Sequence, residues 1–98
     1  MSEKDEYTEM IDAELDVVQA RLDELKVHQR KLAADAQRQR EHARQVEALQ
    51  KMADATKARL KELAEADDDG WHLLKDGVEN IWGELQSTLQ NTVTTFKE

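Results

Sequence analysis

The chain has 98 residues, of which 37% are charged and only 4% aromatic, and it contains three Gly, no Pro and no Cys. This length suits a single domain spanning residues 1–98, and the lack of Cys excludes disulfides, thiol catalysis and thiolate metal sites. The formal net charge of −8 at pH 7 is distributed unevenly: residues 1–27 carry −6, residues 28–61 carry +5 and residues 62–98 carry −7.

The first ten residues are acidic and contain no apolar run, so no secretory signal is expected there. No stretch of about 18 residues is apolar enough to predict a transmembrane helix. The expected location is therefore the cytoplasm.

A long helix is predicted over residues 3–66, because strong helix formers dominate and residues 8–66 contain no Gly, Pro, Asn or Ser. A continuous helix of that length would be a rod about 90 Å long. Such a rod needs a partner to cover its apolar stripe.

The stripe follows the 4–3 spacing of a coiled-coil seam. Polar residues enter the seam at Gln29, Gln39 and Thr56. The seam residues expected at an interface are Ile11, Leu15, Val18, Leu22, Leu25, Leu32, Ala36, Val46, Leu49, Leu60 and Leu63.

Charge predicts the direction in which two such rods pair. Parallel pairing would set like-charged blocks together, whereas antiparallel pairing sets acidic residues 5–27 of one chain beside basic residues 41–63 of the other. We therefore expect the chain to bind itself as an antiparallel dimer with a twofold axis near Ala34. A tetramer built from such antiparallel pairs is the alternative assembly.

Residues 67–70, Asp-Asp-Asp-Gly, interrupt the helical pattern. Consecutive Asp residues favour caps and turns, so Asp68 or Asp69 could cap a new helix, and Gly70 could adopt a left-handed conformation. This pattern favours a helical hairpin, with one continuous, kinked helix as the alternative.

A second amphipathic helix is predicted over residues 71–96, with an 11-residue repeat. Its apolar face needs cover, and the basic half of the long helix is the nearest surface. Folding back would group residues 40–66 and 71–96 with residues 5–30 of a second chain. The interface residues expected on this helix are Trp71, Leu74, Val78, Trp82, Leu85 and Leu89.

The predicted fold class is all-α. It consists of a long coiled-coil helix and a shorter C-terminal amphipathic helix that form a helical hairpin, assembled as an antiparallel helical-bundle oligomer.

Residues 71–82 read WHLLKDGVENIW, a Trp followed by L-K-x-G-V-E-x-x-W, and residues 3–7 read EKDEY. In this layout the chain resembles small bacterial helical proteins of unknown function, described as coiled-coil or stress-response-like. The likeness covers the whole chain in layout and is specific over residues 71–82, while Gly70 and His72 stand where Ala and Glu are usual. It implies no catalytic residues and only a loose link to stress tolerance.

An acidic pattern at Glu65, Asp67, Asp69, Gly70 and Asp76 matches an EF-hand calcium loop only with substitutions. The last position is Asp, which is shorter than the usual bidentate Glu. An acidic turn that ends the helix is the preferred interpretation, so no metal site is predicted.

The three His residues, His28, His42 and His72, share no metal-ligand spacing. His28 and His42 would approach each other across the predicted dimer, where they could form a pH-sensitive or adventitious metal site. Solvated surface histidines are the preferred interpretation.

Two binding alternatives concern nucleic acids and lipids. A basic run could contact phosphates, but it lacks interleaved aromatic residues, and charge pairing within the assembly is preferred. The helix at residues 71–96 could lie on a membrane surface through its Trp residues, although its polar face is mainly acidic. The basic run comprises Arg30, Lys31, Arg38, Arg40 and Arg44.

No Ser-His-Asp arrangement or phosphate-binding Gly loop is discernible in the sequence, so neither an enzyme nor a cofactor is predicted. We interpret the sequence as a non-enzymatic structural or interaction protein that binds itself. The alternatives are lipid-surface or protective binding through residues 71–96, and weak nucleic-acid binding through residues 28–61. Another protein or a membrane surface is a further candidate partner.

Overall fold

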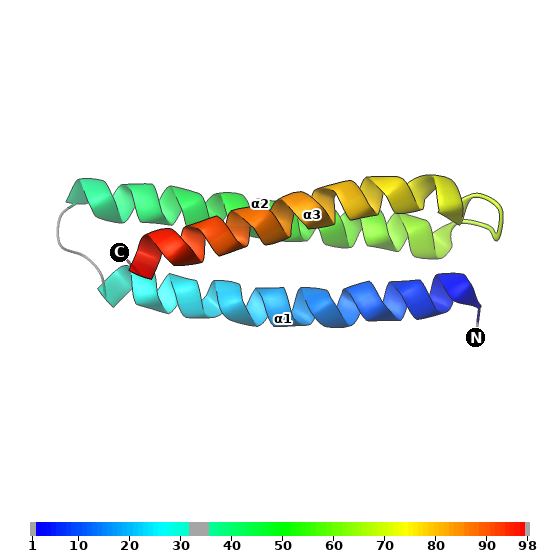
Figure 1. Cartoon of the computed structure of the whole chain (residues 1–98), viewed down its shortest axis with the longest axis horizontal. Helices are drawn as coiled ribbons and strands as arrows, with labels where there is room; N and C mark the ends of the chain where they lie inside the picture. The colour runs from blue at the N-terminus through cyan, green and yellow to red at the C-terminus, as the bar shows by residue number, and fades with distance from the viewer. Residues whose placement is uncertain (1, 32–35, 98) are drawn as a thin grey trace.

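The computed structural model describes residues 2–31 and 36–97, and all regular structure in these residues is helical. Helix α1 spans Glu3–Lys31, α2 spans Ala36–Glu65 and α3 spans Trp71–Lys97 (Figure 1). No strand is found in these ranges, which confirms the predicted all-α class.

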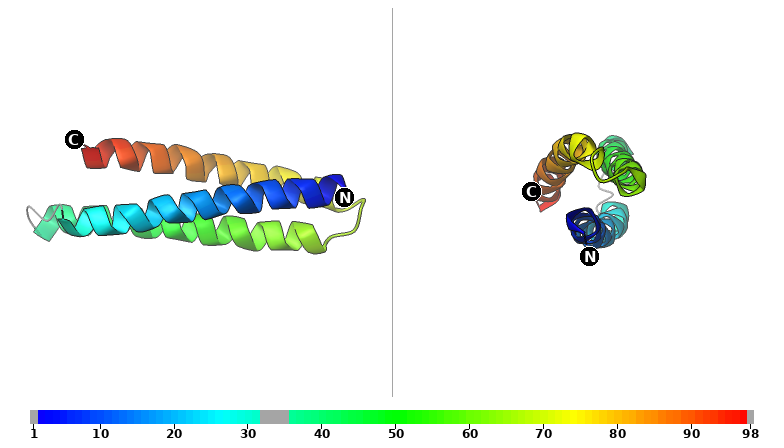
Figure 2. Two further views of the ribbon diagram at one scale, coloured as in Figure 1. Left: turned by 90° about the horizontal axis from the view of Figure 1, so that it is seen from below. Right: turned by 90° about the vertical axis from the view of Figure 1, so that its right-hand side faces the viewer.

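The three helices lie side by side, and each runs antiparallel to the helix that precedes it in the chain (Figures 1 and 2). The molecule measures 52 × 19 × 17 Å, which excludes a continuous helix over residues 3–66. That prediction was wrong because helix propensity is a weak guide, whereas folding back lets the chain cover its own apolar stripe. The predicted twofold at Ala34, and Leu32, lie outside the described residues.

The core between the helices contains most of the residues predicted from the apolar stripes. Two exceptions are Ala36, which is exposed, and Leu74, which is 37% exposed. Both lie in the first turn of a helix at an end of the bundle, where fewer side chains surround them. The buried apolar residues are Ile11, Leu15, Val18, Leu22, Leu25, Val46, Leu49, Ala53, Leu60, Leu63, Trp71, Val78, Trp82, Leu85 and Leu89.

The turn between α2 and α3 is held by Asp67 rather than by Asp68 or Asp69. The Asp67 carboxylate accepts a hydrogen bond of 2.6 Å from the Gly70 N–H. The backbone carbonyl of Asp67 accepts one of 3.2 Å from the Trp71 N–H. Gly70 does not take the predicted left-handed conformation. A Cβ at residue 70 would lie 2.8 Å from the Asp67 Oδ1 atom, so a larger residue there would displace the capping carboxylate.

The end of α2 is also tied to the start of α1. The Lys4 Nζ atom donates a 2.8 Å hydrogen bond to the Ala66 carbonyl oxygen. A cation in this position donates to a carbonyl that has no partner within the helix. It also interacts favourably with the negative end of the helix dipole. The bond therefore joins the first and second helices at the end of the bundle where the chain enters its last turn.

Candidate interaction surface

A pair of glutamines shows the register in which α1 packs on α2. The Gln19 Nε2 atom donates to Gln50 Oε1 at 2.9 Å, and Gln50 Nε2 donates back to Gln19 Oε1 at 2.9 Å. The sequence predicted that residues 5–27 lie beside residues 41–63, and this pair falls within one residue of that register. The pairing occurs within one chain, however, so these contacts do not require the second chain that was predicted to supply them.

Charged side chains on both helices form further hydrogen bonds with the two glutamine amides. Lys26 Nζ donates to Gln50 Oε1 at 2.9 Å, while Asp23 and Asp54 accept from Gln19 and Gln50, each at 3.1 Å. The two glutamines are half-buried, so an amide without a partner would be costly there. This network favours one register of α1 against α2.

Helices α1 and α3 meet through an aromatic contact at one end of the bundle. The ring centroids of Tyr7 and Trp71 lie 6.1 Å apart, and the Lys75 Nζ atom lies 5.2 Å from the Tyr7 centroid and 6.0 Å from that of Trp71. Glu79 holds the Lys75 ammonium at 3.9 Å. Such cation–π contacts add modestly to the burial of the rings.

The Tyr7 hydroxyl is buried without a hydrogen-bond partner. Burial raises the pKa of Tyr7 above its ordinary value of 10.0, and the carboxylates of Glu79, Asp76 and Glu14 raise it further. These surroundings therefore favour the neutral phenol over the phenolate.

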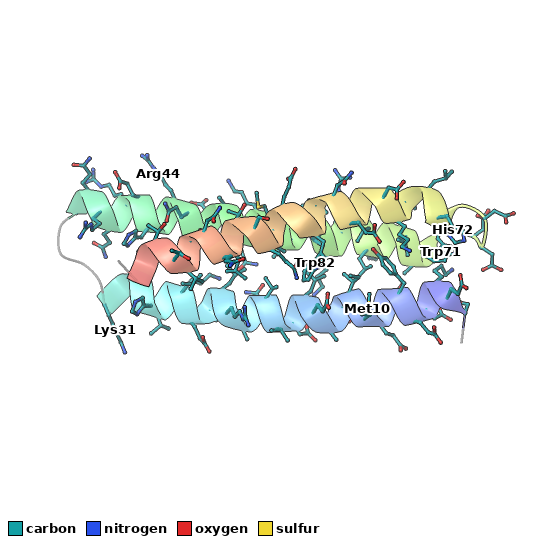
Figure 3. The ribbon with its side chains drawn as sticks, viewed as in Figure 1. Met10, Lys31, Arg44, Trp71, His72 and Trp82 are labelled. Carbon is teal, nitrogen blue, oxygen red and sulfur yellow. The ribbon has the colours of Figure 1, made fainter. Side chains whose placement is uncertain are left out.

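Helix α2 packs extensively against both α1 and α3, whereas α1 and α3 touch each other much less. A groove of about 590 Å³ lies between them. The buried side chains of Val18, Trp82 and Leu89 form part of its lining, and Glu14 and Arg21 also line it from α1. Figure 3 shows Trp82 between α3 and α1.

One face of α1 carries exposed apolar and small residues beside this groove. Met10, Val17 and Val27 are 51%, 56% and 49% exposed, and Ala13 and Ala20 are exposed as well. We call these five residues the outer seam of α1. Their spacings of 3, 4, 3 and 7 are those of a coiled-coil heptad with Glu24 at the omitted position. Sequence reasoning missed this seam, although the spacing was present, because the larger Leu side chains of the inner stripe dominate the pattern.

Charge divides α1 into two unlike halves. Residues 3–16 contain seven acids and one base, whereas residues 17–31 contain two acids and four bases. The three aspartates of the α2–α3 turn lie at the same end of the bundle as the acidic half (Figure 1). The opposite end carries exposed basic residues, among them Lys31 and Arg44 (Figure 3).

Within the described residues, the structure does not bring the candidate metal-binding side chains together into a site. Among the described residues, no group of three or more His, Asp or Glu side chains could hold a metal ion. His28 is exposed and His42 is buried, while the His72 ring lies 4.0 Å from the Trp71 ring. In the acidic pattern that partly resembles a calcium loop, the Asp67 carboxylate is used by the turn itself.

In residues 2–31 and 36–97, no helix combines the length and the apolar character that crossing a membrane would require. Comparison with protein-family models, with curated proteins and with solved structures finds no match to this chain. The outer seam, the groove beside it and the divided charge of α1 are therefore the surface features most relevant to function.

Proposed function

We propose that this chain is a non-enzymatic structural and interaction protein that acts by binding copies of itself through the outer seam of α1. The observation that carries the proposal is the half-exposure of Met10, Val17 and Val27 at heptad spacing. Such a seam gains free energy when another helix covers it. The residues first expected at an interface between chains are mostly buried within one chain, so the proposed contact uses a different face of the same helix.

Two parts of the proposal rest on the sequence. The likeness of residues 71–82 to stress-response-like helical proteins is the ground for linking the assembly to stress tolerance. A cytoplasmic location completes the proposal.

The test is the molar mass of the protein, measured by light scattering coupled to size-exclusion chromatography over a range of concentrations. The wild-type chain should reach at least twice the mass of one chain. Val17→Glu should shift the mass to that of one chain, because it places a carboxylate at the middle of the seam without disturbing a buried position. A wild-type protein that stays monomeric at the highest concentration used would contradict the proposal.

Leu73→Glu is the matched control. Leu73 is 83% exposed, lies on α3 and is outside the outer seam, so the same substitution there should leave the mass unchanged. Equal dissociation by both variants would mean that general surface charge, and not this seam, governs association. Circular dichroism of all three proteins checks that the helices remain formed.

The alternatives predict other results. Trp71 and Trp82 are buried, so lipid binding through them would require α3 to leave the bundle and would change Trp fluorescence when anionic vesicles are added. Nucleic-acid binding would retard DNA or RNA at physiological salt, and replacement of Arg40 and Arg44 would abolish it. Neither result is expected if the outer seam of α1 is the functional surface.

A further inference from the structure

With Glu24 included at its omitted heptad position, the outer seam of α1 has the same spacing of 3, 4, 3, 4 and 3 when it is read in either direction. Its positions are arranged symmetrically about a point between Val18 and Gln19. When two such helices run antiparallel, each residue of the seam therefore lies opposite either another seam residue or Glu24, as in an antiparallel coiled coil. The opposed positions are Met10 with Val27, Val17 with Ala20, and Ala13 with Glu24.

Two charged side chains at the edge of the groove have nearly the same symmetry. Glu14 and Arg21 both line the groove on the α1 side, and their midpoint lies one residue from the centre of the seam. In an antiparallel pair of α1 helices, Glu14 of each copy would lie within about 3 Å of the level of Arg21 in the other, at 1.5 Å per residue. In a parallel pair each residue would lie at the same level as its own copy. The antiparallel arrangement therefore allows two ion pairs that flank the centre of the seam.

The charge of the whole helix favours the same direction. Residues 3–16 carry a net −6 and residues 17–31 carry a net +2. An antiparallel pair sets the acidic half of each copy beside the basic half of the other, whereas a parallel pair sets −6 against −6. Repulsion between like charges across an interface costs several kcal/mol and selects against the wrong orientation.

We propose that the partner of this surface is α1 of a second copy, bound antiparallel so that the two helices cross between Val17 and Ala20. This inference rests on the proposed function, to which it adds the orientation, the register and the charged residues that select them. The seam from Met10 to Val27 is about 26 Å long at 1.5 Å per residue. The groove between α1 and α3 lies beside the crossing point and leaves room for the flank of the second helix.

Cysteine cross-linking tests the orientation directly, because the chain contains no Cys. Met10→Cys and Val27→Cys proteins are mixed in equal amounts and oxidised, and the products are separated on a non-reducing gel and identified by mass. A disulfide requires Cβ atoms about 3.5–4.5 Å apart. The antiparallel dimer therefore predicts that the mixed product, which joins one variant to the other, exceeds both of the products formed between identical variants.

The outcomes separate this inference from the proposed function. If Met10→Cys mainly cross-links to itself, the dimer is parallel, so the inference fails while self-association stands. If no variant cross-links and light scattering gives a monomer, both fail. Leu73→Cys mixed with Val27→Cys is the control, and a yield equal to that of the seam pair would also overturn the inference.

Charge reversal tests the register. Arg21→Glu should raise the dissociation constant of the dimer at least about tenfold, because it sets glutamates against each other, and Glu14→Arg should have a similar effect. The double variant Glu14→Arg with Arg21→Glu recreates the opposite-charge pairs and should return to within about threefold of the wild type. A double variant as weak as the single ones would show that these residues do not face each other.

Discussion

The two faces of α1 differ in the size of their side chains and in what covers them. The inner face contains Ile, Leu and Val side chains that are 7% exposed or less and pack into the core. The outer seam contains Met, Val and Ala, and its three larger members are about half exposed. Large buried side chains determine the fold, whereas a shallow exposed seam supports reversible contact. One helix can therefore close a domain and offer a binding surface with separate sets of residues.

The largest expected effect contrasts the two faces directly. Leu22→Ala removes a fully buried side chain from the inner face and should lower the free energy of unfolding by about 2–5 kcal/mol. Val17→Ala, in the outer seam, should change it by less than about 0.5 kcal/mol in the monomer. Urea unfolding at a concentration that keeps the protein monomeric measures both values. Similar losses for the two variants would remove the distinction between the faces.

A smaller effect is expected where the inner face of α1 borders α2. Gln19→Leu removes both hydrogen bonds between the two amides and leaves the half-buried Gln50 only its bonds to Lys26 and Asp54. It should cost about 1–2 kcal/mol, and Gln50→Leu should cost a similar amount. Replacing both by Leu should recover most of the loss, since no unpaired amide remains. A double-mutant cycle from thermal unfolding measures this coupling, and simple additivity would mean that the two side chains act independently.

The hydrogen bond from Lys4 to Ala66 should contribute less. Lys4→Met keeps the apolar part of the side chain and removes the donor, so it should cost about 1 kcal/mol. Lys51→Met is the matched control, because Lys51 makes only an exposed ion pair of 3.8 Å with Glu47. That control should cost less than about 0.5 kcal/mol, and an equal loss in both variants would count against a role for Lys4 as a cap.

The Tyr7 contact should affect stability only at high pH. The pKa of Tyr7 is raised in the folded state, so folding keeps the phenol protonated, and its contribution is complete below pH 10. Stability should then fall as the pH rises above 10, because the folded state resists forming a buried phenolate. Tyr7→Phe should flatten this dependence in unfolding experiments over that range. An identical pH profile in both proteins would show that Tyr7 does not titrate differently on folding.

The sequence predicted the helical class, the start of α3 at Trp71 and, to within one residue, the register of residues 5–27 beside residues 41–63, because heptad spacing and charge blocks determine which faces pair. It did not predict that α1 and α2 belong to one antiparallel pair within a chain. An antiparallel dimer centred near Ala34 and a single chain in which α2 runs back along α1 bring the same side chains together, so the seam cannot distinguish them. The turn at residues 67–70 was predicted, but Asp67 was not identified as its capping residue, because three adjacent aspartates are equivalent until the backbone selects one.

The order in which the helices pack has a kinetic consequence. Each helix contacts mainly the helix that follows or precedes it along the chain, so the loops that must close during folding are short. Chains dominated by such local contacts fold in microseconds to milliseconds. Because the sequence contains no Pro, no slow prolyl isomerisation delays this process. A newly made chain should therefore collapse into its bundle faster than it can meet another copy.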